Sequence, residues 1–244
     1  TGINTPPEYA SMVCEELSGL TGFPFVKAEN LIEATQDMGA FIELSGTLRQ
    51  MAIRLSKVCN DLRLLSSGPR AGFGEINLPP VQAGSSIMPG KVNPVIPEVV
   101  NQIAFEVIGN DVTVSFAAEA GQLQLNAFEP IIACNLFNSL QYLRQGCLTL
   151  ARNCVSGITA NQLQLQKTVA NSIGIVTALN PYIGYANASS VAKEAAVKGT
   201  GVSEIVVSRG LLSKERLDDI LRPENLTAPR AVPISKVKKI KNLR

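Results

Sequence analysis

The sequence predicts an all-α protein, built as a long-helix bundle followed by a small helical C-terminal domain. Three observations support this prediction. Apolar residues recur at helical spacing between residues 31 and 66, two prolines stand where later long helices would begin, and the β-branched runs are short and isolated. The chain has 244 residues, of which 45% are hydrophobic and 17% are charged. This composition is typical of a globular protein with a substantial core.

The first long helix is predicted from one periodic stripe. Small and apolar residues recur at alternating steps of three and four, namely Leu31, Ala34, Met38, Phe41, Ser45, Leu48, Ala52, Leu55, Cys59, Leu62 and Ser66. Such spacing places them on one face of a helix. No proline interrupts the stretch, so we expect one continuous helix about 50 Å long at the usual rise per residue.

Two further long helices are predicted from the positions of prolines. Proline is favoured in the first turn of a helix, because the N–H groups of that turn have no partner within the helix. We expect Pro97 to begin a helix that carries four apolar residues toward the core, namely Val99, Val100, Ile103 and Val107. We expect Pro130 to begin another helix that runs toward Cys154. Together with the first helix, these two form the predicted bundle.

The predicted boundary between the two domains lies near residue 163. A helical segment is expected from 162 to 178, and it should end before a turn at Asn180 and Pro181. Beyond that turn the predicted helices are short. The sequence therefore predicts a central bundle domain over residues 1–163 and a small helical domain over residues 164–244.

The small domain is predicted to end in a capped helix and a basic tail. Ser213 is a plausible N-cap for a helix over residues 215–221, and Pro223 follows the end of that helix. The formal net charge is only +2, yet five basic residues gather at the C-terminus, namely Lys236, Lys238, Lys239, Lys241 and Arg244. No aromatic residue interleaves this short run. We therefore expect a solvated tail, with no nucleic-acid and no membrane partner.

Composition excludes several kinds of chemistry. The chain contains no histidine, so it cannot supply a Ser/His/Asp triad, a Cys/His dyad or a histidine-bound metal. Neither a GxGxxG fingerprint after a strand nor a GKS/T phosphate loop is present, so we expect no cofactor and no metal. The five cysteines form no CxxC pair, which predicts reduced thiols in a cytoplasmic protein. No apolar run approaches the ~18 residues of a membrane-spanning helix.

The segment GSSIMPGKVNP, residues 84–94, is the strongest candidate for a functional site. Its glycines permit backbone conformations closed to other residues, and its prolines prevent a helix from continuing through it. Ser85 and Ser86 add hydroxyl groups, and Lys91 adds a positive charge. Such a loop favours a bound carboxylate or phosphate. On composition alone, however, a turn with a solvated lysine is the simpler interpretation.

As a string, the segment resembles the signature GSSxMPxKxNP of the fumarase and aspartase superfamily of lyases. Every fixed position of the signature is filled, by Gly84, Ser85, Ser86, Met88, Pro89, Lys91, Asn93 and Pro94. The resemblance runs through most of the chain, from TGINTP at residues 1–6 to RGLLSKERLDDIL at residues 209–221. It implies the helical fold of that superfamily, and it implies that the chain corresponds only to the C-terminal half of such a lyase.

The segments that flank the signature favour one branch of the superfamily. VIPEVVNQ (95–102) and AAEAGQLQLNAFEP (117–130) resemble the aspartate ammonia-lyases, and fumarases usually differ at both places. The stretch ALNPYIGY (178–185) is shared by the two branches, so fumarase remains the alternative. Argininosuccinate and adenylosuccinate lyases usually depart from the first two segments. A helical-bundle fragment without catalytic activity is a further alternative.

The resemblance also implies a reaction and roles for particular residues. The reaction is the reversible β-elimination of ammonia from L-aspartate to give fumarate. In the family the first serine of the signature is the general base, which is Ser85 here. By position in the motif, Ser86 donates to the reacting carboxylate, while Lys91 and Asn93 hold the other carboxylate of the substrate. Glu98 stands where relatives keep a glutamate that pairs with a histidine, and its alternative role is to complement the helix dipole.

The assembly implied by the resemblance is a homotetramer whose active sites gather loops from three subunits. Relatives supply threonine, asparagine and histidine side chains from upstream regions that this sequence does not contain. The implied partner is a small dicarboxylate, L-aspartate or fumarate. We therefore expect the isolated chain to have an incomplete site and very weak or no catalytic activity.

Overall fold

The computed structural model describes residues 3–68, 70–82, 84, 87–88 and 90–229. These residues divide into two compact units, and the boundary along the chain lies between Thr159 and Ala160. The residues up to Thr159 are called unit 1 below, and those from Ala160 onward unit 2. Whether the predicted boundary at residue 163 separates two domains that fold independently stays a prediction.

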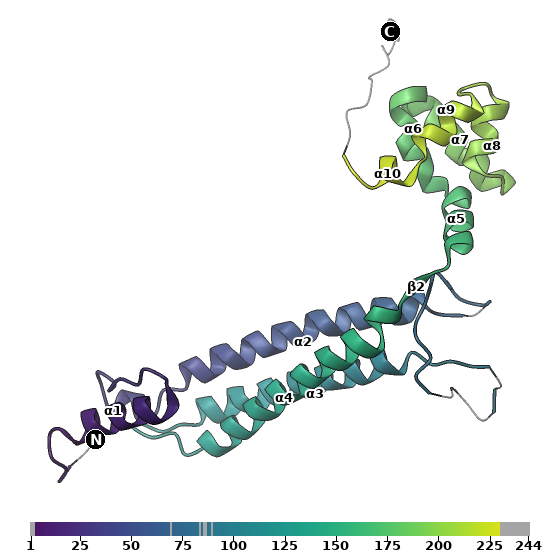
Figure 1. Ribbon diagram of the computed structural model, residues 1–244. Coiled ribbons are helices and arrows are strands. Elements are labelled where there is room, and N and C mark those ends of the chain that lie inside the picture. Colours follow the sequence, from purple (N-terminus) through teal and green to yellow (C-terminus); the bar gives the residue numbers. More distant parts are fainter. Residues whose placement is uncertain (1–2, 69, 83, 85–86, 89, 230–244) are drawn as a thin grey trace, which may run out of the picture. The chain divides into compact units, whose positions relative to one another are not determined.

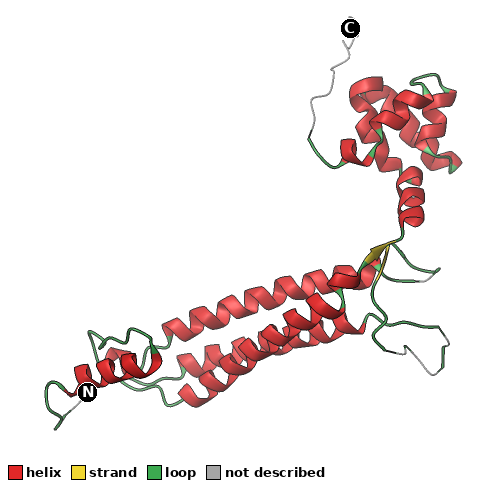
Figure 2. Ribbon diagram, viewed as in Figure 1, coloured by secondary structure: helices red, strands yellow, loops and turns green. Residues whose placement is uncertain are grey.

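Helices dominate both units, as the sequence predicts (Figure 2). In the described part of the chain the strands are limited to two residues each, β1 (Ile76–Asn77) and β2 (Thr159–Ala160), and these two pair with one another. The all-α prediction is therefore confirmed.

Unit 1 is built on three long helices that lie side by side (Figure 1). Its elements besides the strands are α1 (Tyr9–Thr21), the 3₁₀-helix η1 (Glu33–Thr35), α2 (Gly39–Leu65), α3 (Val95–Glu119), α4 (Glu129–Asn153) and the 3₁₀-helix η2 (Val155–Gly157). Helix α3 packs extensively against both α2 and α4, whereas α2 and α4 touch each other only slightly. The predicted long-helix bundle is present, with α3 at its centre.

The first predicted long helix begins later than the periodic stripe, at Gly39. The Asn30 side-chain oxygen accepts hydrogen bonds from the backbone N–H groups of Ile32 and Glu33, at 3.0 and 3.1 Å, and a 3₁₀ turn forms there. The Asp37 side-chain oxygen then accepts from the N–H of Gly39 at 3.2 Å. Asparagine and aspartate side chains that bond the nearby backbone compete with an α-helix in this way. The expectation of one helix from residue 31 was therefore wrong over its first residues.

Within α2 the stripe lies against the rest of the bundle as expected, with one exception. The buried members of the stripe in α2 are Ser45, Leu48, Ala52 and Cys59. Leu55 and Leu62 are partly buried and pack against the core. Phe41 is 45% exposed, so its assignment to the buried face was wrong.

The second long helix, α3, begins at Val95, and Pro97 lies buried in its first turn. Three of the four apolar residues assigned to its core face are buried or partly buried, namely Val100, Ile103 and Val107. Val99 is 40% exposed, because adjacent residues of a helix point in different directions and Val100 occupies the inward one. The assignment of Val99 to the core was wrong.

The third long helix, α4, agrees with its prediction at both ends. It begins at Glu129 with Pro130 in its first turn, and it ends at Asn153, directly before Cys154. Its buried apolar residues are Ile132, Leu136, Leu143 and Leu150. They recur at helical spacing along one face, as expected for a helix that packs on α3.

Unit 2 consists of short helices around an aliphatic core. Its elements besides Ala160 are α5 (Gln162–Asn171), the 3₁₀-helix η3 (Ile173–Ile175), α6 (Val176–Ile183), α7 (Tyr185–Lys198), α8 (Val202–Ser208), α9 (Lys214–Ile220) and α10 (Pro223–Leu226). The core contains Leu179, Val191, Val206, Leu217 and Ile220, each at most 1% exposed. Ser213 caps α9 as predicted, because its hydroxyl accepts a hydrogen bond from the N–H of Arg216 at 3.3 Å.

Two expectations for the start of unit 2 were wrong. The segment from 162 to 178 is not one helix, because the Ser172 hydroxyl accepts from the N–H of Gly174 at 3.3 Å and begins a 3₁₀ turn there. The predicted turn at Asn180 and Pro181 lies inside α6 instead. Buried residues on either side of this pair hold the helix in the core, and the helix ends only at Gly184, which has a φ of +81°.

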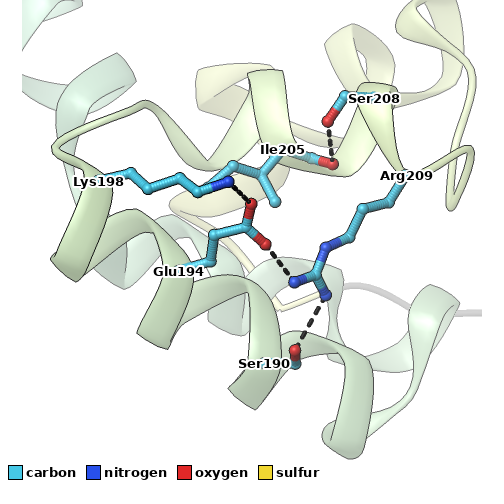
Figure 3. Close-up of polar contacts among 6 residues, drawn as sticks. All are labelled: Ser190, Glu194, Lys198, Ile205, Ser208 and Arg209. Carbon is cyan, nitrogen blue, oxygen red and sulfur yellow. Dashed lines mark hydrogen bonds and ion pairs between the residues drawn. The ribbon is translucent and has the colours of Figure 1, made fainter.

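An ion pair between Arg209 and Glu194 fastens the end of α8 to α7 in unit 2 (Figure 3). The Glu194 carboxylate on α7 accepts from the Lys198 ammonium at 2.7 Å and from the guanidinium of Arg209, which follows α8. The same guanidinium donates to the Ser190 hydroxyl at 2.9 Å. Hydrogen bonds from Lys198 first, and then from Arg209, lower the pKa of the Glu194 carboxyl. The cluster thereby holds the C-terminal end of α8 on α7.

The described helices were also compared with the length and apolarity that a membrane-spanning helix needs. Among residues 3–229, outside the positions not described, no helix meets both requirements.

Candidate active site

The signature segment lies in the long connection between α2 and α3, at the end of the bundle where α4 also ends (Figure 1). Two residues of this region hold its backbone against the bundle. Leu78 in the connection and Ile96 in the first turn of α3 pack on a buried cluster made by Cys59, Val100, Leu150 and Cys154. The Asn77 amide also donates to the Thr159 hydroxyl at 3.2 Å. The connection is therefore anchored at its middle and at its end.

The first part of the connection folds tightly around Ser67. The Ser67 hydroxyl accepts from the N–H of Phe73 at 3.1 Å, and its carbonyl accepts from the N–H of Gly74 at 2.8 Å. A Cβ atom on Gly72 would lie 2.5 Å from the carbonyl carbon of Ser67. Only glycine fits at that point, which gives Gly72 a structural role in this turn.

The signature segment closes on itself in the same manner. A Cβ atom on Gly84 would lie 1.7 Å from the carbonyl oxygen of Lys91, so the backbone at Gly84 is in direct contact with the backbone at Lys91. The Asn93 side-chain amide donates to the Gly84 carbonyl at 3.1 Å. The N–H of Lys91 donates to the Met88 carbonyl at 3.2 Å, next to Gly90 with its φ of +78°. Residues 84 and 91–93 therefore form the closed neck of a loop.

The candidate site residues differ in what the structure says of them. Ser85 and Ser86 lie outside the described residues, so their predicted roles stay predictions. Lys91 lies at the neck of the loop with an exposed side chain, and Asn93 is half-buried there with its amide on Gly84. The structure thus brings Asn93 against the residue that directly precedes Ser85 in the sequence.

Glu98 lies in the first turn of α3, where its backbone N–H donates to the Pro94 carbonyl at 3.1 Å. Within the described chain no hydrogen bond or ion pair of its carboxylate is observed. An acid in this turn is favourable for the helix dipole. Its predicted pairing with a histidine from another region stays a prediction.

The electrostatics of the neck favour an anion. The signature segment ends at Pro94, directly before the first residue of α3, so the positive end of that helix dipole lies next to it, and the only cation in the sequence of the segment is Lys91. Over the described residues, no group of three potential histidine, cysteine or carboxylate ligands is placed to hold a metal ion. The groups present suit hydrogen bonding and charge stabilisation of a carboxylate.

Sequence reasoning missed a buried side-chain amide that bonds the start of α3 to α2. Asn101 on α3 is buried and bonded to Ser56 and Asn60 on α2. The available signal was a carboxamide in phase with the buried residues Pro97, Val100 and Ala104. Because its partners come from a different helix, the sequence alone does not identify them.

Two family models match the chain. The model described as lyase matches residues 1–109, and the model described as fumarase C C-terminus matches residues 175–228. The first match includes the whole signature segment, and the second lies within unit 2.

The chain is similar to curated aspartate ammonia-lyases from several bacteria. The chain is 58% identical over 234 residues to the aspartate ammonia-lyase of Pseudomonas fluorescens, which covers 96% of the chain and 49% of the relative. It is 58% identical over 231 residues to that of Helicobacter pylori and 57% identical over 229 residues to that of Escherichia coli K12, covering 95% and 94% of the chain. The chain spans about half the length of the curated relatives that it matches.

Solved structures agree with this similarity. A fumarate lyase:delta crystallin from Brucella melitensis, bound to cobalt, matches with a TM-score of 0.88 and 51% identity, over 93% of this chain and 49% of that one. A class II fumarase from Schistosoma mansoni matches with a TM-score of 0.83 and 34% identity, over 91% of this chain and 50% of that one.

Fold, signature segment and family matches together define a lyase sequence of the fumarase and aspartase superfamily, and the chain belongs to this superfamily. Within the superfamily its similarity is to the aspartate ammonia-lyases, at 57–58% identity across nearly the whole chain. The resemblance expected from the signature is thereby confirmed.

Proposed function

We propose that the chain carries the signature-loop portion of an aspartate ammonia-lyase, which converts L-aspartate to fumarate and ammonia reversibly. The observation that carries this proposal is the similarity to curated aspartate ammonia-lyases at 57–58% identity over 94–96% of the chain. The intact signature at residues 84–94 lies inside that matched region. The close contact of Gly84 with Lys91 and Asn93 supports a loop whose two ends are held together.

The proposed reaction removes a proton from the carbon next to one substrate carboxylate. This carbon acid is very weak, so the negative charge that develops on the carboxylate oxygens has to be held by preorganised donors. Ser85 takes the proton as the general base, and Ser86 donates a hydrogen bond to that carboxylate. The carbon–carbon double bond then forms as the carbon–nitrogen bond breaks, and the electron pair leaves with ammonia.

The other substrate carboxylate is assigned to Lys91 and Asn93. Lys91 has an exposed ammonium at the neck of the loop, which is available for a charge-assisted hydrogen bond. Asn93 bonds Gly84 through its amide nitrogen, so it fixes the start of the loop as well as standing beside the proposed binding position. Glu98, in the first turn of α3, is proposed to pair with a histidine from a region outside this chain.

The proposed assembly is a homotetramer with active sites shared between subunits. The three long helices of unit 1 expose many large apolar side chains, among them Phe41, Met51, Ile53, Phe105, Phe116 and Phe137. Apolar surface of this extent on long helices supports association with further helices. The isolated chain is then expected to lack catalytic activity, since part of each proposed site comes from elsewhere. The free thiols support a cytoplasmic location.

Fumarase activity, the hydration of fumarate to L-malate, is the second candidate. It is favoured by the match of residues 175–228 to the fumarase C C-terminus model and by the likeness to the Schistosoma mansoni class II fumarase. The residues that distinguish an amine from a hydroxyl leaving group are not among those assigned here. The two candidates therefore have to be separated by the substrate offered.

The decisive test joins the chain to the N-terminal half of the Pseudomonas fluorescens aspartate ammonia-lyase, giving a full-length hybrid. Fumarate is followed by its ultraviolet absorbance with L-aspartate and, separately, with L-malate. We expect fumarate from aspartate alone. Ser85→Ala should lose this activity, whereas Ser11→Ala, which alters an exposed serine on α1, should keep it. Activity on malate alone would assign a fumarase, and a folded hybrid silent on both would favour a bundle without catalysis. Steady fumarate production by the chain on its own would contradict the expected inactivity of the fragment.

A further inference from the structure

A buried amide joins the beginning of α3 to the end of α2. It belongs to Asn101, which lies seven residues after the last residue of the signature segment, Pro94. Asn101 is 3% exposed, and its side-chain nitrogen donates to the Ser56 hydroxyl at 2.8 Å, to the Ser56 carbonyl at 3.1 Å and to the Asn60 side-chain oxygen at 3.1 Å. Its side-chain oxygen accepts from the Arg63 guanidinium at 3.4 Å. Both ends of the amide therefore have partners on α2.

This set of bonds holds α3 in one position along α2. An amide that bonds three residues over two turns of the neighbouring helix resists both sliding and rotation, because any such movement leaves buried polar atoms without partners. Apolar contacts alone are less directional. Val100, beside Asn101, packs on the buried thiol of Cys59 and on Leu150 in the same region.

The first turn of α3 links this anchor to the signature loop. Asn101 lies three residues beyond Glu98, which is nearly one helical turn. The N–H of Val95, the first residue of α3, donates to the Asn93 carbonyl at 2.9 Å, and Asn93 in turn bonds Gly84 at the other side of the loop neck. A displacement of the first turn of α3 would therefore move Asn93 and open the neck.

We propose that Asn101 is a positioning residue of the candidate active site, and that its amide holds the first turn of α3 so that Asn93 keeps its hydrogen bond to Gly84 at the loop neck. The kinetic consequence of this inference depends on the proposed ammonia-lyase function, whereas its structural consequence does not. In the described part of the chain the side-chain hydrogen bonds of Asn101 go to α2, so it acts through α3, which carries Glu98 and whose first residue, Val95, bonds Asn93.

The bundle offers a matched control on the same helix. Asn110 is likewise buried on α3, at 8% exposure, and its side-chain nitrogen donates to the Ser139 hydroxyl on α4 at 3.2 Å. It lies nine residues farther from the loop, or about 13 Å along the helix axis. Asn101→Ala and Asn110→Ala each remove one buried amide, but only the first lies at the site end of α3.

Hydrogen exchange on the full 244-residue chain tests the structural part. For Asn101→Ala we expect the amides between residues 91 and 98 to exchange about tenfold faster than in the unchanged chain. For Asn110→Ala these amides should exchange at the unchanged rate. Ser56→Ala, which keeps the Ser56 carbonyl and the Asn60 oxygen as acceptors, provides a milder variant if Asn101→Ala fails to fold. It should accelerate exchange in the same segment by less.

Steady-state kinetics on the full-length hybrid test the functional part. A base displaced from its proton lowers kcat steeply, so we expect Asn101→Ala to lower kcat about tenfold or more with a smaller change in KM. Asn110→Ala should leave both values unchanged once corrected for folded protein. A merely structural role would lower the folded fraction and leave kcat per folded molecule intact.

The outcomes separate this inference from the proposed function. Equal exchange between residues 91 and 98 in the two alanine variants would overturn the positioning role, whatever the activity of the hybrid. Equal kcat values would also overturn it. If the unchanged hybrid produced no fumarate, the proposed function would fail, while the exchange experiment would still decide whether Asn101 holds the loop.

Discussion

The cores of the two units differ in chemical character. All eight buried polar or charged residues in the described chain belong to unit 1, namely Ser45, Ser56, Asn101, Asn110, Asp111, Asn126, Asn135 and Ser139. The buried cluster of unit 2 is entirely hydrophobic. Unit 2 gains its shape from short helices around aliphatic side chains, while unit 1 sets long helices against one another with directional polar contacts.

The difference follows from the geometry of the elements. Long, nearly parallel helices with small residues in their stripes are able to slide by a turn with little loss of apolar contact. A buried hydrogen-bonded pair such as Ser45 with Asp111, at 2.7 Å, is satisfied in one register only. Short helices that meet at varied angles are fixed by the shapes of their side chains, so unit 2 needs no such pairs.

The largest expected effect comes from emptying the aliphatic core. Leu179→Ala, at a fully buried position on α6, should lower the free energy of unfolding of unit 2 by about 3 kcal/mol, because it removes apolar contacts and leaves a cavity. Urea denaturation followed by far-UV circular dichroism measures this loss. Leu163→Ala on α5, at 84% exposure, should change stability by less than about 0.5 kcal/mol. Equal losses in the two variants would contradict the core assigned to unit 2.

A pH-dependent effect of similar size is expected in unit 1. Burial, with a smaller contribution from Cys154, raises the pKa of the Cys59 thiol from 9.0 to about 11. Below pH 9 the thiol is protonated in the folded and unfolded chains alike, so its contribution to stability is fully present. Between pH 9 and 11 only the unfolded chain releases the proton, which removes about 2 to 3 kcal/mol of stability.

Comparison with Cys59→Ala isolates this contribution. Urea denaturation at pH 8.5 and 10.5 gives the loss of stability for each protein, and the loss should be clearly smaller in the variant. Titrating groups that do not interact with Cys59 affect both proteins equally. Identical losses would show that Cys59 ionises in the folded chain as easily as in the unfolded one.

A smaller effect is expected from removing one polar pair of unit 1. Asp111 accepts from the buried Ser45 hydroxyl at 2.7 Å and pairs with the partly exposed Arg49 guanidinium at 3.2 Å. Asp111→Ala should lower the free energy of unfolding by about 2 kcal/mol, because the hydroxyl loses its acceptor in a buried place. Asp61→Ala breaks the exposed pair with Lys57 and should cost less than about 0.5 kcal/mol. Thermal denaturation of both variants measures the two losses of stability. An equal loss would show that the buried pair contributes no more than an exposed one.

The features predictable from sequence are those encoded by local spacing. The three-and-four stripe identified α2, and Pro130 identified the start of α4, because helical periodicity and proline chemistry act within one element. The start of α2 was misplaced because Asn30 and Asp37 bond the backbone nearby, which periodicity does not register. Pro181 was misread because the core of unit 2 keeps α6 helical through it.

The candidate site divides along the same line. The signature string identifies residues 84–94 by itself, whereas the contact of Gly84 with the Lys91 carbonyl depends on how the loop closes in space. Asn101 is further removed from local sequence signals. Its main partner, Ser56, lies 45 residues earlier in the chain, and only the packing of α2 on α3 brings the two together.

The smallest expected effect concerns the cap of α9 in unit 2. The Ser213 hydroxyl accepts from the N–H of Arg216, and a second bond from Ser213 contributes, after the backbone N–H of Glu215, to lowering the pKa of the Glu215 carboxyl. Ser213→Ala should lower the free energy of unfolding by about 1 kcal/mol, while Ser213→Gly, which suits the N-cap backbone, should lose only a few tenths. Urea denaturation of the two variants measures the difference. If glycine destabilised unit 2 as much as alanine, the backbone preference of the cap would be unimportant here, and the hydroxyl alone would account for the loss.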